Sequence, residues 1–327
     1  MIKHTHTEKA DINFHQLEER LCYANTHINK AMEKMEEVVA ALEGPTLLMA
    51  TGGSKCVAYY LQSILDYRGI ISEVVEPRTM FHKPNMNAYR NLIAISNSGK
   101  TNGLEQAFML FPNQKHLITA SDITLDDCNI ISYQEAISSK EKSFVSLATS
   151  FIPMLMLLKM TQEEVFCNEQ LINMLTESKE FSKQFKELFS SVSGIEILSG
   201  YETTCAASVL ESNLVETGVC PVVIHDKGSY CHGRSNLKFN YSQQPMIYLM
   251  HEEQELDSML LEVLTSQYDF IYPVVSKGEQ QTMRDYDLAL KMAYLSREIA
   301  SDKEIDLCQP EYNPKVIKKV YSYKGEM

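Results

Sequence analysis

The sequence has no apolar run long enough to cross a membrane. The longest one, residues 145–158, contains Ser, Thr and Pro and falls short of the roughly 20 residues that a transmembrane helix needs. Residues 1–30 are polar and lack the apolar segment of a secretory signal. We therefore expect a cytoplasmic protein with no membrane partner.

Positive charge is scarce relative to negative charge. The chain has 30 Lys and Arg residues against 43 Asp and Glu residues, and its net charge is −13. Binding a nucleic acid backbone requires clustered Lys and Arg, so this balance argues against nucleic acid and against an anionic membrane surface as partners. An acidic protein can still bind a small phosphate through backbone N–H groups and hydroxyls.

Paired cysteines are also missing. The eight cysteines are scattered and form no Cys-x-x-Cys pair, which is typical of reduced thiols in a cytosolic protein. Cys220, His225, Cys231 and His232 lie close together in the sequence, but their spacing fits no common zinc pattern. We expect no metal and no cofactor.

What the chain does contain is an alternation of short apolar strands and helices. A helical pattern covers residues 14–42 and ends at Gly44-Pro45. Strand patterns lie at 46–51, 70–75, 92–96, 116–120, 130–132, 195–199, 246–250 and 270–275. Helical patterns lie at 56–65, 104–111, 144–159, 204–217 and 256–265. This order predicts an α/β fold built from βαβ units with mostly parallel sheets.

The length and a weak internal repeat predict two similar domains. A chain of 327 residues is long enough for two domains of ordinary size. One shift of the sequence aligns Cys56 and Leu61 with Cys205 and Leu210. We expect an N-terminal helical segment at 1–44, a first domain at 45–162, a helical linker at 163–193 and a second domain with a C-terminal tail at 194–327.

The loop Ser96–Thr101 is the strongest candidate for ligand binding. It reads Ser-Asn-Ser-Gly-Lys-Thr, follows a predicted buried strand and precedes a helix. Open α/β sheets bind ligands at this carboxyl edge, where N–H groups and hydroxyls can hold an anion. A solvent-facing loop that only caps the helix fits these residues equally well. The turn Gly52-Gly53-Ser54 occupies the same kind of position one strand earlier.

The corresponding loop in the second half differs in charge. It reads His251-Glu252-Glu253-Gln254-Glu255, and its three carboxylates would repel a phosphate. We therefore expect only the first domain to bind the anion.

These two loops carry a resemblance to a known family. The segments ATGGSKCVA (50–58) and AISNSGKTNGLEQAF (94–108) resemble the sugar isomerase (SIS) domain family, in which a Gly-x-Ser turn and an I-S-x-S-G-x-T loop hold a phosphosugar. The resemblance covers about residues 45–325. It is greatest to the tandem-SIS isomerase half of glucosamine-6-phosphate synthase and to related deglycases and ketose isomerases.

The resemblance implies a fold and a set of phosphosugar ligands. It implies two tandem SIS domains, each a flavodoxin-like three-layer sandwich. The implied phosphosugar-binding residues are Gly53, Ser54, Ser96, Asn97, Ser98 and Thr101. The family's sugar-lining segment corresponds loosely to residues 145–149, where a buried helix fits the sequence better.

The family takes a catalytic Glu from a helix of its second domain. Glu216 fits the E-x-T-x-G-like end of that helix in ketose isomerases, and Glu211 fits its start. Five residues correspond to about 140° around a helix, so the two carboxylates cannot face one pocket. We favour Glu216 as the base that moves a proton between C1 and C2 of the sugar. A solvated helix face is the plain alternative for either residue.

Two further catalytic residues follow from the resemblance. His232, in Cys231-His232-Gly233-Arg234, corresponds to the His-Gly with which the family opens the sugar ring in a neighbouring subunit's site, although Arg234 replaces the usual Pro. Lys315 lies five residues after Pro310, as does the family lysine that forms a Schiff base with the open-chain sugar. The resemblance therefore implies a homodimer with shared active sites.

The resemblance leaves the reaction open. It implies a phosphorylated sugar or aminosugar as substrate and an aldose/ketose isomerase, an aminosugar-phosphate deaminase or a fructosamine-phosphate deglycase. We expect no glutaminase domain, because only residues 1–44 precede the first domain and the first cysteine is Cys22. A non-catalytic phosphosugar sensor is the alternative. The absence of G-x-G-x-x-G argues against a nucleotide-binding Rossmann enzyme.

Overall fold

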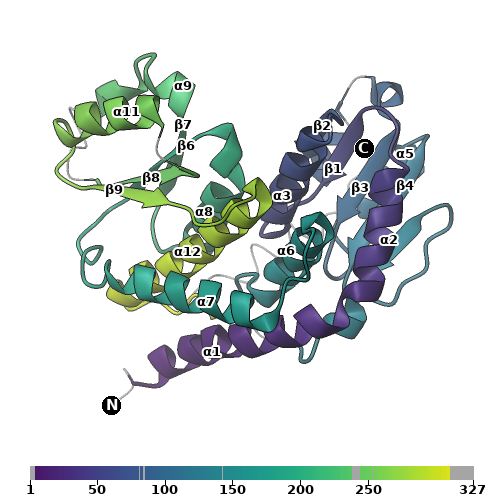
Figure 1. Cartoon of the computed structure of the whole chain (residues 1–327), viewed down its shortest axis with the longest axis horizontal. Coiled ribbons are helices and arrows are strands. Elements are labelled where there is room, and N and C mark those ends of the chain that lie inside the picture. Colours follow the sequence, from purple (N-terminus) through teal and green to yellow (C-terminus); the bar gives the residue numbers. More distant parts are fainter. Residues whose placement is uncertain are drawn as a thin grey trace. The chain divides into compact units, whose positions relative to one another are not determined.

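The computed structural model describes residues 4–80, 82, 83, 85–141, 143–237, 244–252 and 254–309 (Figure 1). The strands are β1 (Thr46–Met49), β2 (Ser72–Val75), β3 (Asn91–Ile95), β4 (Gln114–Thr119), β5 (Asn129–Ser132), β6 (Ile195–Ser199), β7 (Val222–Asp226), β8 (Met246–Met250) and β9 (Ile271–Val275). The helices are α1 (His4–His27), α2 (Asn29–Ala40), α3 (Ser54–Tyr67), α4 (Pro77–Met80), α5 (Leu104–Leu110), α6 (Ala148–Thr161), α7 (Asn168–Lys183), α8 (Thr204–Glu216), α9 (Lys227–Tyr230), α11 (Glu255–Thr265) and α12 (Gln281–Asp302).

The chain divides into two compact units, each with its own sheet. Among the described residues, the first unit contains 19–141 and 148–167. The second unit contains 4–18, 143–147 and 168–309. The segment predicted as a linker includes α7, which packs against α12 inside the second unit.

The first unit is built on a five-stranded parallel sheet. Its strand order is β2-β1-β3-β4-β5, the order of flavodoxin-like sheets. Strands β1 and β3 are buried along their whole length, as expected for central strands covered by helices on both faces. One face packs Leu47, Leu92 and Leu117 against Phe108 of α5, while α3 packs against α6 elsewhere in the unit. All the strands are parallel, so their carboxyl ends and the loops that follow lie at one edge.

The predicted helix at 14–42 is two helices in the structure. The break falls at Ile28, between α1 and α2. The side chains of Thr26 and His27 both lie 2.8 Å from the carbonyl oxygen of Tyr23. Side chains that bond to a helical carbonyl compete with the backbone, which accounts for the interruption at this point.

The second unit is built on a four-stranded parallel sheet. Its strand order is β7-β6-β8-β9. Helix α12 packs against both α7 and α8 and carries a buried ion pair between Lys291 and Asp287, 2.7 Å apart. The strand and helix patterns in the sequence omit β7 and α12. Strand β7 is a largely exposed edge strand, and buried charged residues interrupt the apolar pattern of α12.

Two parallel sheets flanked by helices confirm the predicted α/β class.

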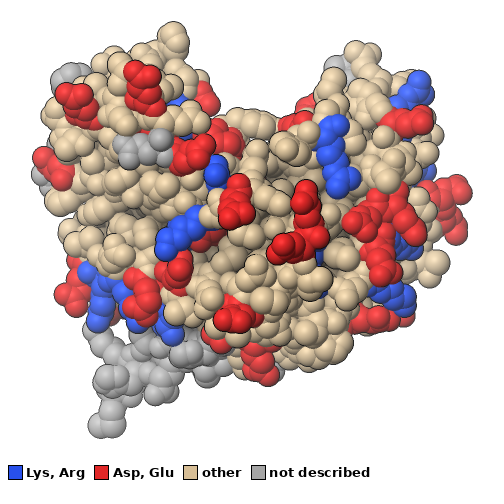
Figure 2. All heavy atoms as spheres, viewed as in Figure 1, with Lys and Arg blue, Asp and Glu red and all other residues tan. Residues whose placement is uncertain are grey.

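On the face drawn in Figure 2, acidic side chains are spread over the surface with Lys and Arg side chains scattered among them. Within the part of the chain that the structure describes, no helix combines the length and the apolar character needed to span a membrane.

Candidate functional site

The loop after β3 closes through its own hydroxyls. Ser96 Oγ lies 2.6 Å from Thr101 Oγ1, and the Gly99 N–H donates to the Ser96 carbonyl at 3.0 Å. Ser96 is only 2% exposed, whereas Ser98 is exposed and accepts a hydrogen bond from the Lys100 N–H at 3.2 Å. The loop therefore has a hydroxyl pair at its base, with Ser96 buried and Thr101 half-buried, and an exposed serine at its surface.

Gly99 is required by the shape of this loop. Its φ is +64°, in the left-handed region that favours glycine. A Cβ at this position would lie 2.4 Å from Cδ1 of Ile123. A side chain at position 99 would therefore strain the backbone and displace the end of the Ile123 side chain.

Asn97 is fixed by neighbouring strands. Its carbonyl accepts hydrogen bonds from the Ala120 N–H at 3.1 Å and from the hydroxyls of Thr119 and Ser121, each at 3.2 Å. Its side-chain Oδ1 accepts a hydrogen bond from the Tyr133 hydroxyl at 3.1 Å. Burial raises the pKa of Tyr133, and Glu141 adds to this effect, so the hydroxyl stays a neutral donor.

The loop motifs do not contain Thr119, Ser121 and Tyr133. The sequence nevertheless marks these residues by their position at the ends of predicted strands. Each lies at or just after the carboxyl end of β4 or β5. Polar residues that end consecutive parallel strands meet at one edge of the sheet. Applying that rule to every predicted strand would have added these residues to the candidate site.

The turn after β1 lies at the same edge. The Gly53 carbonyl accepts a hydrogen bond from Ser150 Oγ at 3.2 Å, and Ser54 begins α3. Tyr133 also donates to the Thr149 carbonyl at 3.4 Å. The start of α6 therefore contacts the β1 turn directly and the β3 loop through Tyr133. Gly53, Ser54, Ser96, Asn97, Ser98 and Thr101 all lie at the carboxyl edge of the first sheet.

The N-terminus of α6 is occupied by a carboxylate of the chain itself. Glu141 accepts hydrogen bonds from the N–H groups of Ala148 and Thr149 at 2.9 and 3.0 Å, and from Thr149 Oγ1 at 2.7 Å. Arg20 Nη1 lies 3.9 Å from this carboxylate, and both side chains are 5% exposed. The sequence pattern predicts that this helix starts at residue 144. In the structure α6 begins at Ala148, so residues 145–147 lie before the helix.

The corresponding edge of the second sheet is rich in acidic groups. His251 Nε2 lies 2.6 Å from Asp285 Oδ1, and the Lys227 ammonium donates to Glu202 at 2.9 Å and to Asp257 at 3.1 Å. Burial alone would raise the pKa of Asp257. Its hydrogen bonds from Tyr248, the Gln254 N–H and Lys227 together lower it instead. Lys227 and His251 on this edge are already paired with carboxylates.

Two of the predicted catalytic residues, Glu216 and His232, do not lie together in the second unit. Glu216 ends α8, is exposed, and accepts a hydrogen bond from Ser212 at 2.7 Å. His232 is exposed and lies just beyond α9, where its N–H donates to the Ser229 carbonyl at 3.1 Å. Because Glu216 precedes β7 and His232 follows it, they lie toward opposite edges of the second sheet. Lys315 lies outside the described residues.

Three solved structures share the fold of this chain. The C-terminal domain of glucosamine-fructose-6-phosphate aminotransferase from Francisella tularensis is 12% identical with a TM-score of 0.70, covering 94% of this chain and 99% of that one. Glucosamine-6-phosphate deaminase from Thermotoga maritima is 14% identical with a TM-score of 0.64, covering 89% and 97%. A protein described as a phosphosugar isomerase from Clostridium difficile is 15% identical with a TM-score of 0.64, covering 98% of each chain.

The chain has the tandem SIS fold. The resemblance inferred from the two loop motifs is thereby confirmed at the level of structure. No family model matches the chain, and no curated protein matches it. At these identities the likeness establishes the SIS fold alone.

Proposed function

We propose that this SIS-fold chain binds a phosphorylated sugar or aminosugar and acts on its open-chain form. The observation that supports this proposal is the group of hydroxyls at the carboxyl edge of the first sheet. It combines the Ser96–Thr101 pair, the exposed Ser98 and the Gly53-Ser54 turn at the start of α3. Solved structures of the same fold carry names of phosphosugar isomerases and deaminases.

In this proposal, neutral donors hold the phosphate. Hydroxyls and helix N–H groups can stabilise a dianion without Lys or Arg. Lys55, the basic residue next to the β1 turn, already forms an ion pair with Glu76. The acidic net charge is therefore compatible with a phosphate site of this kind.

The proposed chemistry uses three groups outside the phosphate loop. His232 of a second subunit assists ring opening, and the Lys315 amine adds to the exposed carbonyl and forms a Schiff base with loss of one water, which hydrolysis later restores. Glu216 then moves a proton between C1 and C2. This sequence of steps serves an isomerase, a deaminase or a deglycase alike.

Glu211 remains the competing base. Helix α8 runs away from the carboxyl edge of its sheet, so Glu211 lies nearer that edge than Glu216. Ser212 already holds the Glu216 carboxylate. Product formation by Glu211→Gln and Glu216→Gln variants separates the two, because only loss of the true base abolishes turnover while phosphosugar binding persists.

A panel of ligands tests the binding proposal. Hexose and hexosamine 6-phosphates should raise the thermal unfolding temperature, while the unphosphorylated sugars should not. Ser98→Ala and Thr101→Ala should remove that stabilisation, and Thr124→Ala, at an exposed position of the same unit, should retain it. Equal stabilisation of all the variants would contradict the assignment of the phosphate to this loop.

A phosphosugar sensor without catalytic activity is the second candidate. The observation that favours it is the Glu141 carboxylate, which fills the N-terminus of α6 beside the loop. Product analysis of the ligands that stabilise the protein decides between enzyme and sensor. Borohydride reduction with fructose 6-phosphate, followed by peptide mass mapping, should label Lys315 in wild type and nothing in Lys315→Ala if the chain is a Schiff-base enzyme.

A further inference from the structure

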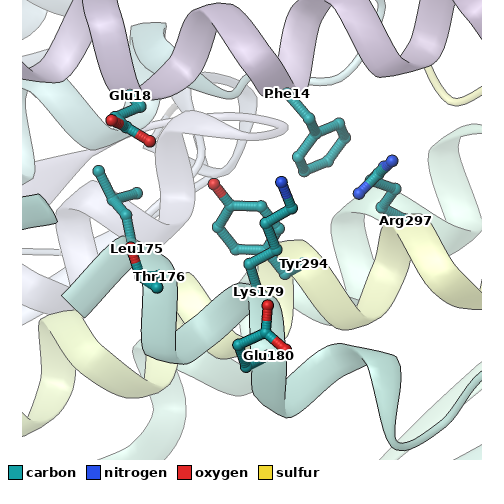
Figure 3. Close-up of a pocket in the computed structure, with 8 residues that line it drawn as sticks. All are labelled: Phe14, Glu18, Leu175, Thr176, Lys179, Glu180, Tyr294 and Arg297. Atoms are coloured by element: carbon teal, nitrogen blue, oxygen red, sulfur yellow. The ribbon is translucent and has the colours of Figure 1, made fainter. Parts of the chain in front are cut away.

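A pocket of about 160 Å³ lies within the second unit, between α1, α7 and α12 (Figure 3). It contains none of the residues proposed for phosphosugar chemistry. Eight residues line it: Phe14, Glu18, Leu175, Thr176, Lys179, Glu180, Tyr294 and Arg297. Pairs such as Phe14 with Glu18 and Leu175 with Lys179 are four residues apart, so each helix presents one face to the pocket.

Tyr294 directs its hydroxyl into this pocket. The residue is only 4% exposed, and Figure 3 shows its hydroxyl on the side that faces Glu18 and Leu175. The hydroxyl has no hydrogen-bond partner among the described residues. Burial raises the pKa of Tyr294 to about 12, with Glu18 adding to the effect and Arg297 opposing it, so the group remains a neutral donor and acceptor. A ligand in the pocket can therefore bond to this hydroxyl.

The pocket also presents one free charge of each sign. Neither the Lys179 ammonium nor the Glu18 carboxylate forms an ion pair with a described residue. The other two charged groups are engaged: Glu180 lies 2.5 Å from Lys183, and the Arg297 guanidinium stacks 5.6 Å from the centre of the Phe14 ring. A ligand that matches both free groups carries a negative and a positive charge.

Size and apolar surface narrow the ligand further. The rings of Phe14 and Tyr294 lie 5.6 Å apart and, with Leu175, form an apolar wall. A cavity of about 150 Å³ in another protein holds benzene, so this volume accommodates a ligand of roughly six to nine non-hydrogen atoms. A zwitterion of that size with a short side chain is a small α-amino acid.

We infer that this pocket binds a free small α-amino acid. The ligand carboxylate lies against Lys179, with Arg297 as its cationic neighbour, and the ligand ammonium lies against Glu18. The Tyr294 hydroxyl bonds to the ligand's polar end, and the side chain of the ligand contacts Phe14 and Leu175. This site is independent of the proposed phosphosugar chemistry, and either proposal can fail while the other stands.

Isothermal titration calorimetry with L-alanine, L-serine and L-aspartate tests the inference on the full chain. At least one of these should bind, and propionate and isopropylamine, which carry one charge each, should bind at least about tenfold more weakly. Lys179→Met and Glu18→Gln should each weaken the amino acid by about tenfold or more, and Tyr294→Phe by a smaller factor.

Matched controls remove other exposed charges of the second unit. Lys186→Met and Glu169→Gln should bind the amino acid as wild type does, with circular dichroism confirming that every variant is folded. Three results would overturn the inference: no binding of any amino acid at millimolar concentration, propionate binding as tightly as alanine, or equal affinities for Lys179→Met and Lys186→Met. The second result would indicate a simple anion site.

Discussion

At the residue scale, the shape of the β3 loop depends on a glycine whose backbone conformation other residues adopt only with strain. Gly99 combines a left-handed backbone with a close approach to Ile123. The loop carries Ser98 and Thr101 on either side of this point, so a change at position 99 moves both hydroxyls. Stability and ligand binding should therefore respond together to a substitution there.

Gly99→Ala should lower the free energy of unfolding by about 2 kcal/mol, measured by urea denaturation. Gly69→Ala is the matched control, because Gly69 also has a left-handed φ of +75° but has open space where a Cβ would be. The Gly99 variant should lose more stability than the Gly69 variant. Adding Ile123→Ala to the Gly99 variant should reduce the extra loss, because it removes the side chain that the new Cβ contacts. Equal losses would show that the contact with Ile123 has no effect.

Asp257 gives a prediction about pH. Because its folded pKa is lowered, its contribution to stability is complete above its unfolded pKa of about 4 and is lost as the pH falls through the folded pKa. Asp257→Asn should be about 1–3 kcal/mol less stable than wild type at pH 7, and the two should converge in acid. Asp269→Asn, at an exposed position, should differ little from wild type at either pH. A gap that is constant from pH 7 to pH 3 would contradict the assignment.

The loop motifs could be read from the sequence because each is a continuous segment. Ser96–Thr101 and Gly53-Ser54 both follow an apolar strand and precede a helix, and the structure places them at one edge of a sheet. Tyr133 could not be found in the same way, because its bond to Asn97 depends on the order in which strands pair. Glu141 depends on the return of the chain at Ala148, which no local pattern encodes.

At the element scale, α6 depends on a carboxylate from outside the helix. Glu141 accepts from two of its first N–H groups, where negative charge also interacts favourably with the helix dipole. Arg20 lies beside this carboxylate. The cap therefore connects α1, α6 and the loop before α6.

Glu141→Gln should lower the free energy of unfolding by about 1–2 kcal/mol, since the amide keeps one acceptor but loses the charge. The matched change Glu135→Gln breaks an exposed ion pair with Lys30 and should cost less than about 0.5 kcal/mol. Urea denaturation of both variants provides the comparison. Similar losses at the two positions would mean that the cap contributes no more than a surface charge.

The limits of prediction at this scale have physical causes. The sequence pattern predicts strands such as β6 and β8 at their observed bounds, because they are buried along their whole length and therefore form largely apolar runs. Helix α12 is buried on most sides and includes Asp285, Asp287 and Lys291, so neither an apolar stripe nor a polar face marks it. Tertiary ion pairs make those charges tolerable, and a single sequence does not show them.

At the scale of the whole molecule, the two units have the same kind of sheet but different chemistry at the carboxyl edge. Hydroxyls dominate the first edge, and paired carboxylates and cations dominate the second. This difference agrees with the expectation that one domain of a tandem pair binds the phosphate. In the proposed function, the second unit contributes the catalytic groups, in this chain or in a second copy.

The proposed sharing of sites between subunits predicts a homodimer of the 37.3 kDa chain, measurable by light scattering. His232→Ala and Lys315→Ala subunits should each be inactive alone. Mixing them after reversible unfolding should restore about a quarter of wild-type activity, because half of the dimers then contain one intact site. A monomer, or no recovery in mixed dimers, would contradict shared sites.

The most direct test of the central claim is a crystal structure of the chain with fructose 6-phosphate. We expect the phosphate at the carboxyl edge of the first sheet, within hydrogen-bond distance of the Ser98 and Thr101 hydroxyls and near the Ser54 turn. A phosphate bound at the second sheet, or ordered density that avoids the Ser96–Thr101 loop, would contradict it.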